Sequence, residues 1–257
     1  MAEQKTPVLE TRKLGISFGG LKAVQDFNLQ MYQGELVGLI GPNGAGKTTV
    51  FNLLTGVYVP TEGTVLLDGT PLNGKKTHQV GAAGIARTFQ NIRLFGDMTV
   101  LENVKVAFSK DIHYGLLDAI FRTPRFWKTE ESLTEKAMDL LSIFHLEDKA
   151  DWLASSLPYG QQRKLEIARA LATNMKVLLL DEPAAGMNPT ETAELLECIN
   201  TIRDRFGIAI LLIEHDMSLV MNVCQRIQVI DYGQTIATGL PEEIAANPRV
   251  IAAYLGE

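Results

Sequence analysis

The sequence predicts an α/β fold with a mostly parallel sheet and flanking helices, an N-terminal antiparallel β part and a helical subdomain. Three observations carry this prediction. A short apolar run at 35–40 precedes a glycine-rich loop and then a helical stretch. Two further apolar runs, Val177–Leu180 and Ile208–Ile213, end in polar side chains, as buried strands of open α/β sheets do. Residues 99–150 instead carry apolar side chains at helical spacing.

Composition bounds the class of protein. The chain has 257 residues and an apolar content of 46%, so we expect one large domain, or one domain with a subdomain. Its apolar runs are far shorter than a membrane-spanning helix needs. The formal net charge of −6 disfavours a general nucleic-acid binder, because phosphate backbones attract basic surfaces.

The sequence gives little sign of a signal peptide, a disulfide or a metal cluster. Residues 1–7 lack the apolar core of a signal peptide, so we expect a cytosolic protein. Cys198 and Cys224 lie in apolar surroundings without C-x-x-C spacing, and we expect reduced packing residues. The four histidines, at 78, 113, 145 and 215, lack metal-ligand spacing.

The stretch that organises the chain reads Gly41-Pro42-Asn43-Gly44-Ala45-Gly46-Lys47-Thr48-Thr49. This is the G-x-x-x-x-G-K-[ST] pattern of a phosphate-binding loop. Its glycines let backbone N–H groups point at phosphate oxygens, and the following helix adds its positive end. We expect Lys47 to reach the β- and γ-phosphates of a nucleotide and the Thr48 hydroxyl to ligate Mg²⁺. A chance glycine-rich turn is the alternative, but the strand before the loop and the helix at 49–56 disfavour it.

The residues before and after this loop predict strands. Residues 8–33 indicate two strands joined by a turn at Gly19-Gly20, and residues 61–72 indicate a strand that ends in a turn. For Phe18, just before the first turn, two interpretations stay open. The ring is either a surface on which a purine stacks or a packing residue of the hairpin.

A glutamine follows the next predicted strand. Residues 85–95 indicate a strand that runs into a polar loop at Gln90. A glutamine in this place is able to coordinate Mg²⁺ or orient a water, although an ordinary loop amide is the commoner case.

The middle of the chain predicts helices. Thr99 opens a capped helix, and helical spacing continues over 115–121 and 128–144 with a break at Thr123-Pro124. One side of the longer stretch carries Leu133, Ala137, Leu140, Leu141 and Phe144. From Gln161 a further amphipathic helix follows, and its N-terminus is a second potential anion site.

Two carboxylates follow the run Val177–Leu180. Asp181 and Glu182 stand where open α/β sheets place their ligands, so we expect Asp181 to hold Mg²⁺ through its water shell and Glu182 to polarise the attacking water. A surface turn is the alternative, which the upstream phosphate loop disfavours. His215 follows the run Ile208–Ile213 and is able to contact the γ-phosphate, although alone it suggests a surface histidine.

The remaining chain predicts a helix from Pro189, strands near 225–231 and 235–237, and two short helices from Pro241 and Pro248.

The motifs together resemble those of an ATP-binding-cassette (ABC) ATPase over essentially the whole chain. They occur in the family's order and are Gly41–Thr48, Gln90, Leu157–Gln161, Leu178–Glu182 and His215, with Phe18 in place of the adenine-stacking aromatic. The resemblance implies a single ABC domain, 1–257. It divides into a P-loop NTPase core with an antiparallel β part, 1–95 and 174–257, and a helical subdomain with the signature segment, 96–173.

A closer resemblance is to the ATP-binding subunits of branched-chain amino-acid importers. It rests on the segments 115–124, 182–189 and 239–256. Subunits for urea uptake or lipopolysaccharide export are built similarly and stay as alternatives. A soluble ABC ATPase acting on nucleic acid is a remoter one, because the helical insertion is too short for a coiled-coil arm. A P-loop kinase would not explain the segment Leu157–Gln161 or His215.

The resemblance also implies cofactors, partners and location. The cofactors are ATP and Mg²⁺, and Glu182, His215 and Gln90 act in hydrolysis, Gln90 also near the metal. Two cassettes pair head to tail, and each ATP lies between one loop and the Tyr159, Gly160 and Gln161 segment of the other. Two transmembrane permease subunits, and indirectly an extracytoplasmic substrate-binding protein, complete an importer. The chain then lies on the cytoplasmic face of the membrane, with no nucleic acid expected.

One segment departs from the family pattern. The common signature reads L-S-G-G-Q, and here the residues are Leu157-Pro158-Tyr159-Gly160-Gln161. Pro158 offers neither the serine hydroxyl nor an N–H. We therefore expect weaker contact between this segment and ATP on the partner cassette.

Overall fold

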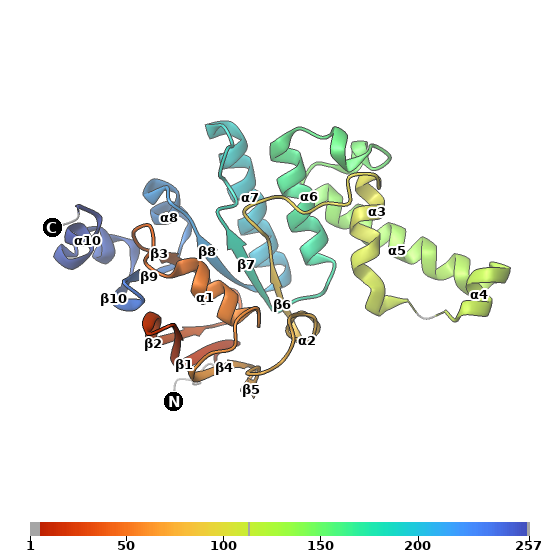
Figure 1. Ribbon diagram of the computed structural model, residues 1–257. Coiled ribbons are helices and arrows are strands. Elements are labelled where there is room, and N and C mark those ends of the chain that lie inside the picture. The colour runs from red at the N-terminus through yellow and green to blue at the C-terminus, as the bar shows by residue number, and fades with distance from the viewer. Residues whose placement is uncertain (1–5, 113, 256–257) are drawn as a thin grey trace, which may run out of the picture. The chain divides into compact units, whose positions relative to one another are not determined.

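The computed structural model describes residues 6–112 and 114–255, which form two compact units (Figure 1). The core unit comprises Met1–Arg87, Met175–Pro183 and Ile202–Glu257, and the helical unit comprises Thr88–Asn174 and Ala184–Thr201. Residues 1–5, His113 and the last two residues, among them Gly256 of the tail segment, lie outside the described residues.

The core unit contains a six-stranded sheet in the order β10-β9-β3-β8-β7-β6. Its strands are β3 (Leu36–Ile40), β6 (Ile85–Arg87), β7 (Val177–Asp181), β8 (Ala209–Ile213), β9 (Arg226–Asp231) and β10 (Gln234–Gly239). All neighbours are parallel except β9 and β10. Every residue of β3, β7 and β8 is buried, which explains why these strands are continuous apolar runs. The mostly parallel sheet expected from the sequence is confirmed.

A second, antiparallel sheet of the core unit has the order β2-β1-β4-β5. Its strands are β1 (Leu9–Phe18), β2 (Leu21–Met31), β4 (Glu62–Leu67) and β5 (Thr70–Pro71). The turn at Gly19-Gly20 joins β1 to β2, as predicted. One hydrophobic core draws on this sheet, on the six-stranded sheet and on α1 (Lys47–Leu54), whose Phe51 is fully buried.

Four further short helices lie in the core unit. They are α2 (Thr77–Ala83), α8 (Met217–Val223), α9 (Pro241–Ala245) and α10 (Pro248–Leu255). The last two begin at the predicted prolines, whereas α2 and α8 were not predicted from the sequence. Helix α2 buries only Val80, so it has no apolar stripe to detect. Asp216 is the N-cap residue of α8, and its carboxylate accepts from the Ser218 and Leu219 N–H groups, an N-cap signal that was available in the sequence.

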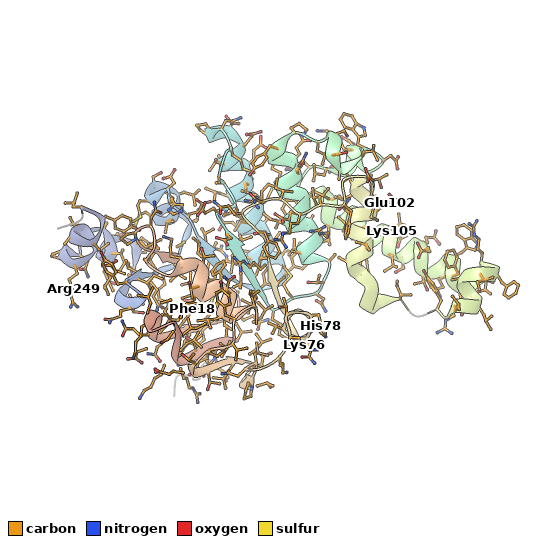
Figure 2. All side chains as sticks on the ribbon, viewed as in Figure 1. Phe18, Lys76, His78, Glu102, Lys105 and Arg249 are labelled. Carbon is orange, nitrogen blue, oxygen red and sulfur yellow. The ribbon has the colours of Figure 1, made fainter. Side chains whose placement is uncertain are left out.

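The helical unit is built on four α-helices and three short 3-10 helices. The α-helices are α3 (Val100–Lys105), α4 (Leu116–Phe121), α5 (Pro124–Ile143) and α6 (Tyr159–Leu171). The 3-10 helices are Val106–Asp111, Glu147–Lys149 and Ala154–Ser156. The first part of α7 (Pro189–Phe206) also belongs to this unit. Thr99 and Glu102 form the predicted capping box of α3. Figure 2 labels Glu102 and Lys105 on this helix.

Two helices begin earlier than the sequence predicted. Helix α5 starts at Pro124 rather than at 128, because a proline in the first turn loses no intrahelical hydrogen bond. Helix α6 starts at Tyr159 rather than at Gln161, with Pro158 as its N-cap residue. The predicted apolar side of α5 is buried at Leu133, Ala137, Leu140, Leu141 and Phe144.

Both cysteines are free and buried, as expected. Burial raises the pKa of the Cys224 thiol to about 12 and also raises the pKa of Cys198, so neither is a reactive thiolate near neutral pH. Within the described ranges, no helix combines the length and the apolar character needed to cross a membrane.

Candidate functional site

Three neighbouring strands of the core unit end at one edge of the sheet. Parallel strands place their carboxyl ends together, and β8 lies between β3 and β7. The predicted phosphate loop follows β3, Asp181 and Glu182 stand at the end of β7, and His215 follows β8. Residues that are far apart in the chain therefore meet at one edge, where open α/β sheets bind ligands.

The backbone of the loop requires glycine at two positions. Gly41 has φ +154, and a Cβ there would lie 2.0 Å from the Ile230 carbonyl oxygen. Gly46 has the left-handed φ of +105 directly before α1, and its Cβ would lie 2.9 Å from the Ala23 carbonyl oxygen. No larger residue fits either position without displacing the backbone, so the loop passes close against β2 and β9.

The Lys47 side chain is folded into its own loop. Its Nζ donates to the Gly41 oxygen at 2.6 Å and to the Pro42 oxygen at 2.9 Å, and the residue is only 7% exposed. Burial lowers the pKa of Lys47, while the carboxylates of Glu182 and Asp181 act in the opposite direction. A phosphate is therefore able to replace the two carbonyls as the hydrogen-bond partner of the Lys47 ammonium.

Glu182 and His215 form a pair. His215 Nε2 lies 2.6 Å from Glu182 Oε1, with the histidine side chain half exposed and the glutamate side chain 16% exposed. Glu182 has a left-handed φ of +48, and its N–H donates to the Ile213 oxygen at 2.9 Å. This bond ties the turn after β7 to the end of β8 and so orients the carboxylate toward the histidine.

Asp181 is engaged with an arginine that the sequence analysis missed. The Arg87 guanidinium donates to Asp181 Oδ2 at 2.7 Å and to Asn52 Oδ1 at 2.7 Å, and it lies 5.4 Å from the Phe51 ring centroid. The two charged side chains are 8% and 7% exposed. Arg87 therefore links the end of β7 to α1. The available signal was a charged residue at the end of a buried strand, directly before the polar loop.

Removing Arg87 is expected to destabilise the core unit. An Arg87→Ala variant leaves the Asp181 carboxylate buried without its partner, which costs about 3–5 kcal/mol of unfolding free energy. Denaturant unfolding of the two proteins measures the difference. The exposed ion pair of Arg12 with Glu10 supplies a matched control, and Arg12→Ala should change the unfolding free energy little. Equal losses in the two variants would contradict the role of Arg87.

Phe18 is neither buried nor fully exposed. It lies at the end of β1 and is 44% exposed (Figure 2). Its ring packs edge-on against Tyr58, with centroids 5.2 Å apart and an interplanar angle of 71°. Because 44% of Phe18 stays exposed beside this contact, the ring keeps both a packing partner and surface for a base.

The predicted Mg²⁺ ligands of the core unit have suitable chemistry. Within the described residues, the exposed Thr48 hydroxyl makes no hydrogen bond. Asp181 accepts from Arg87 through Oδ2, and its Oδ1 has no hydrogen-bond partner there. Hydroxyl and carboxylate oxygens are the donors that Mg²⁺ takes, with phosphates and waters completing its shell. The described residues contain no cluster of three or more His, Cys, Asp or Glu side chains that would hold a metal alone. The donor set therefore fits a nucleotide-bound Mg²⁺.

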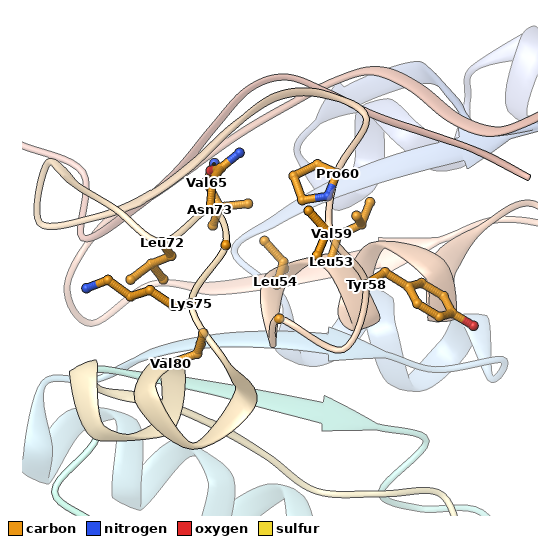
Figure 3. Close-up of a pocket in the computed structure, with 12 residues that line it drawn as sticks. Leu53, Leu54, Tyr58, Val59, Pro60, Val65, Leu72, Asn73, Lys75 and Val80 are labelled. Carbon is orange, nitrogen blue, oxygen red and sulfur yellow. Dashed lines mark hydrogen bonds between the residues drawn. The ribbon is translucent and has the colours of Figure 1, made fainter.

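A nearby cavity of the core unit is a separate feature. It lies beside the end of α1 and is lined mainly by apolar side chains, with Leu53, Leu54 and Val80 among them (Figure 3). Its volume of about 10 Å³ holds about one water molecule. It is a packing gap and not the nucleotide site.

In the helical unit, Gln90 lies in an exposed loop held by a buried arginine. Arg163 of α6 is fully buried and donates to the Phe89 and Gln90 backbone oxygens. Its charge is paired with Glu166 at 2.9 Å. Arg163 was not predicted as a site residue, although a charged pair on the apolar side of an amphipathic helix was a signal for it. Arg163 sets the backbone path from which the Gln90 side chain extends.

The signature residues begin α6. The Tyr159 ring is half exposed and packs beside Gly186, and a Cβ on the buried Gly160 would lie 2.9 Å from Glu191 Oε1. Gln161 Oε1 accepts from Lys149 Nζ at 2.7 Å. Helix α6 has no side-chain cap, and the Gln161 and Gln162 N–H groups both donate to the Pro158 oxygen at 3.0 Å. The Tyr159 and Gly160 N–H groups are therefore the donors of the first turn that an anion would meet.

Known proteins resemble the chain over nearly its full length. The family model described as ABC transporter matches residues 24–185, and the model described as branched-chain amino acid ATP-binding cassette transporter matches residues 234–257. The chain is 49% identical to the high-affinity branched-chain amino acid transport ATP-binding protein LivG of Escherichia coli K12 and 48% identical to BraF of Pseudomonas aeruginosa, with 98% of each chain covered. The crystal structure of the ATP-binding cassette MJ1267 in its ADP conformation has a TM-score of 0.84 at 32% identity. It covers 98% of this chain and 100% of that one.

The fold and the edge of the sheet described above define a P-loop enzyme that hydrolyses ATP. The chain belongs to the ABC transporter family, as an ATP-binding cassette that couples this hydrolysis to transport.

Proposed function

We propose that the chain energises the uptake of branched-chain amino acids. The observation that carries this proposal is the match of residues 234–257 to the branched-chain amino acid family model, beside 49% identity to a branched-chain amino acid protein over 98% of both chains. The carboxyl-terminal segment is where this chain resembles that subfamily in particular.

In the proposed mechanism, the phosphates of ATP bind the backbone N–H groups of the loop 41–46 and displace the carbonyl contacts of Lys47. Mg²⁺ would be held by Thr48 and, through water, by Asp181, and when bound it neutralises phosphate charge. Glu182 accepts the proton of the attacking water. His215, 2.6 Å from Glu182, holds the carboxylate in place and contacts the γ-phosphate. Phe18 stacks on the adenine.

The other half of the proposed site comes from a second cassette. Two cassettes, either two copies or this chain with a different one, would pair head to tail, so that Tyr159, Gly160 and Gln161 of one face the ATP of the other. ATP would have to replace Lys149 as the partner of Gln161. Gln90 would be a further ligand of the metal or would orient the attacking water. The helical unit would receive a cytoplasmic helix of one of two permease subunits, which places the chain at the inner face of the cell membrane.

Copurification tests the proposal directly. The chain is tagged in its native cell, the membrane is solubilised gently, and the proteins that stay bound are identified. Two different permeases, a second cassette and an extracytoplasmic amino-acid-binding protein are expected, together with loss of leucine uptake in a deletion strain. Recovery of exporter-type membrane proteins would overturn the amino-acid assignment. Recovery of no membrane protein would overturn the transport role.

The unusual signature gives a gain-of-function prediction. Pro158 has φ −55 and ψ 152 at the N-cap of α6, angles that serine adopts readily. A Pro158→Ser variant supplies the missing hydroxyl, and one hydrogen bond to a charged phosphate corresponds to an ATP-dependent dimer that is about 10–100-fold tighter. Sedimentation over a range of ATP concentrations measures the dimer. Unfolding of the ATP-free variant is the control, because serine also caps the helix, and an unchanged dimer constant would refute the prediction.

A further inference from the structure

The helical unit exposes a cluster of large apolar side chains at one end of α5, which we define as the tip surface. Its members Leu116, Leu117, Ile120, Phe121 and Trp127 are between 55 and 78% exposed. No residue of α4 is buried. Figure 1 shows α4 at the end of α5 that lies away from α6. A contiguous apolar patch of this kind marks an interaction site.

The apolar side chains of α4 share one face. Positions 116, 117, 120 and 121 follow helical spacing, while Asp118 and Ala119 between them are only partly exposed. The Asp118 carboxylate accepts from the Gly115 N–H at 3.2 Å and from the Thr123 hydroxyl at 2.8 Å, and these bonds lower its pKa. Asp118 therefore stabilises the turn between α4 and α5.

The charge around the tip surface is opposite in sign to that of the whole chain. Between 114 and 129 the basic residues are Arg122, Arg125 and Lys128, all exposed, and the one acid is Asp118, whereas the whole chain has a formal net charge of −6. The Arg122 guanidinium lies 6.0 Å from the Trp127 ring centroid. The tip thus combines aliphatic, aromatic and cationic groups.

The acids nearest the tip surface lie further along α5. Glu130 lies further along α5 and is bonded to Lys105 at 2.9 Å and to the Tyr114 hydroxyl at 2.9 Å. Glu131 and Glu135 follow it toward the middle of the helix. These acids line one hollow with Arg122, Phe126 and Trp127. Arg122 therefore faces acids there, whereas Arg125 and Lys128 do not line the hollow and supply the remaining positive charge of the segment.

We propose that the tip surface binds the anionic lipid surface of the membrane, with the apolar face of α4 inserted between headgroups. Short amphipathic helices that lie in the interface carry this set of residues, tryptophan prefers the headgroup level, and basic residues are attracted to anionic lipids. The contact would set the angle of the cassette against the bilayer. It rests on the proposed function only in placing the chain at a membrane.

Tryptophan fluorescence of the full chain tests the lipid contact. The protein has two tryptophans, so a Trp152→Phe variant reports on Trp127 alone. The probes are vesicles of phosphatidylcholine, with and without phosphatidylglycerol, and the same vesicles with brominated acyl chains. Vesicles that contain phosphatidylglycerol are expected to shift the emission to the blue, and their brominated form to quench it.

Variants separate the apolar and the charged contributions. Leu117→Ser with Phe121→Ser should weaken vesicle binding by at least about ten-fold. Arg125→Gln and Lys128→Gln should each weaken it by about five-fold. Tyr232→Ser removes an aromatic residue that is 84% exposed in the core unit and is the matched control, with no expected change. ATPase activity of each variant confirms that the chain is folded.

Two results would overturn the proposal. One is an affinity for vesicles that does not depend on phosphatidylglycerol and is unchanged in every tip variant. The other is absence of binding to vesicles that contain phosphatidylglycerol. A Trp127 shift on addition of detergent-purified permease would then assign the tip to a protein partner. Vesicle binding is measured without leucine uptake, so failure of the lipid contact and failure of the amino-acid assignment are read separately.

Discussion

Replacing Glu182 by glutamine is expected to leave ATP binding intact and to slow hydrolysis by about 10²–10⁴-fold. The amide keeps the shape of the side chain and a contact to His215, but it cannot accept the proton of the attacking water. A cassette that binds ATP without hydrolysing it should accumulate as a closed dimer. Phosphate release gives the rate, and size-exclusion chromatography with ATP gives the dimer.

Two further variants sharpen this test. Glu62→Gln removes an exposed carboxylate at the start of β4 and should hydrolyse ATP at the normal rate. His215→Ala should also slow hydrolysis, because Glu182 loses its partner at 2.6 Å. Near-normal turnover of Glu182→Gln would show that another group accepts the proton.

Replacing Lys47 by alanine is expected to weaken nucleotide binding by about 10–100-fold, the equivalent of one hydrogen bond to a charged group. The loss arises because the phosphates no longer meet the ammonium. The Gly41 and Pro42 carbonyls also lose their donor, but only in the nucleotide-free protein, because the phosphates displace those contacts on binding. Calorimetric titration with ADP and with ATP measures the affinity.

A lysine elsewhere in the core unit provides the comparison. Lys176 is about half exposed and pairs with Asp68 at the surface, so Lys176→Ala should bind nucleotide normally. A loss confined to ATP, with ADP affinity unchanged, would show that Lys47 contacts only the γ-phosphate. Unchanged affinity for both nucleotides would remove Lys47 from the binding site.

The sequence predicted the elements that have a strong local signal. Strands β3, β7 and β8 are buried on both faces, so each is an uninterrupted apolar run, and the fully buried side of α5 repeats at helical spacing. Helices α2 and α8 are seven residues long and bury few side chains, so the periodicity that identifies longer helices is absent.

The predicted site shows the same division. Spacing identified Lys47, Asp181 and Glu182, because phosphate loops and strand-end acids are local patterns. The contacts that hold these groups are not local. Arg87 reaches Asp181 across 94 positions of sequence, and Arg163 reaches the Gln90 loop across 73. No pattern in one sequence pairs such residues. The burial of both arginines is a different matter, because Arg87 ends strand β6 and Arg163 lies on the apolar side of helix α6.

The strand order of the six-stranded sheet has a consequence for synthesis on the ribosome. Strand β3 ends at Ile40, and its partner β8 begins at Ala209, so at about 5–20 residues per second β3 waits about 8–35 s for a neighbour. All five of its residues are apolar or glycine, a segment prone to aggregate while unpaired. The β1–β2–β4 sheet and α1 are complete by residue 67 and share its hydrophobic core, so they are able to shelter β3 until the rest of the site is made.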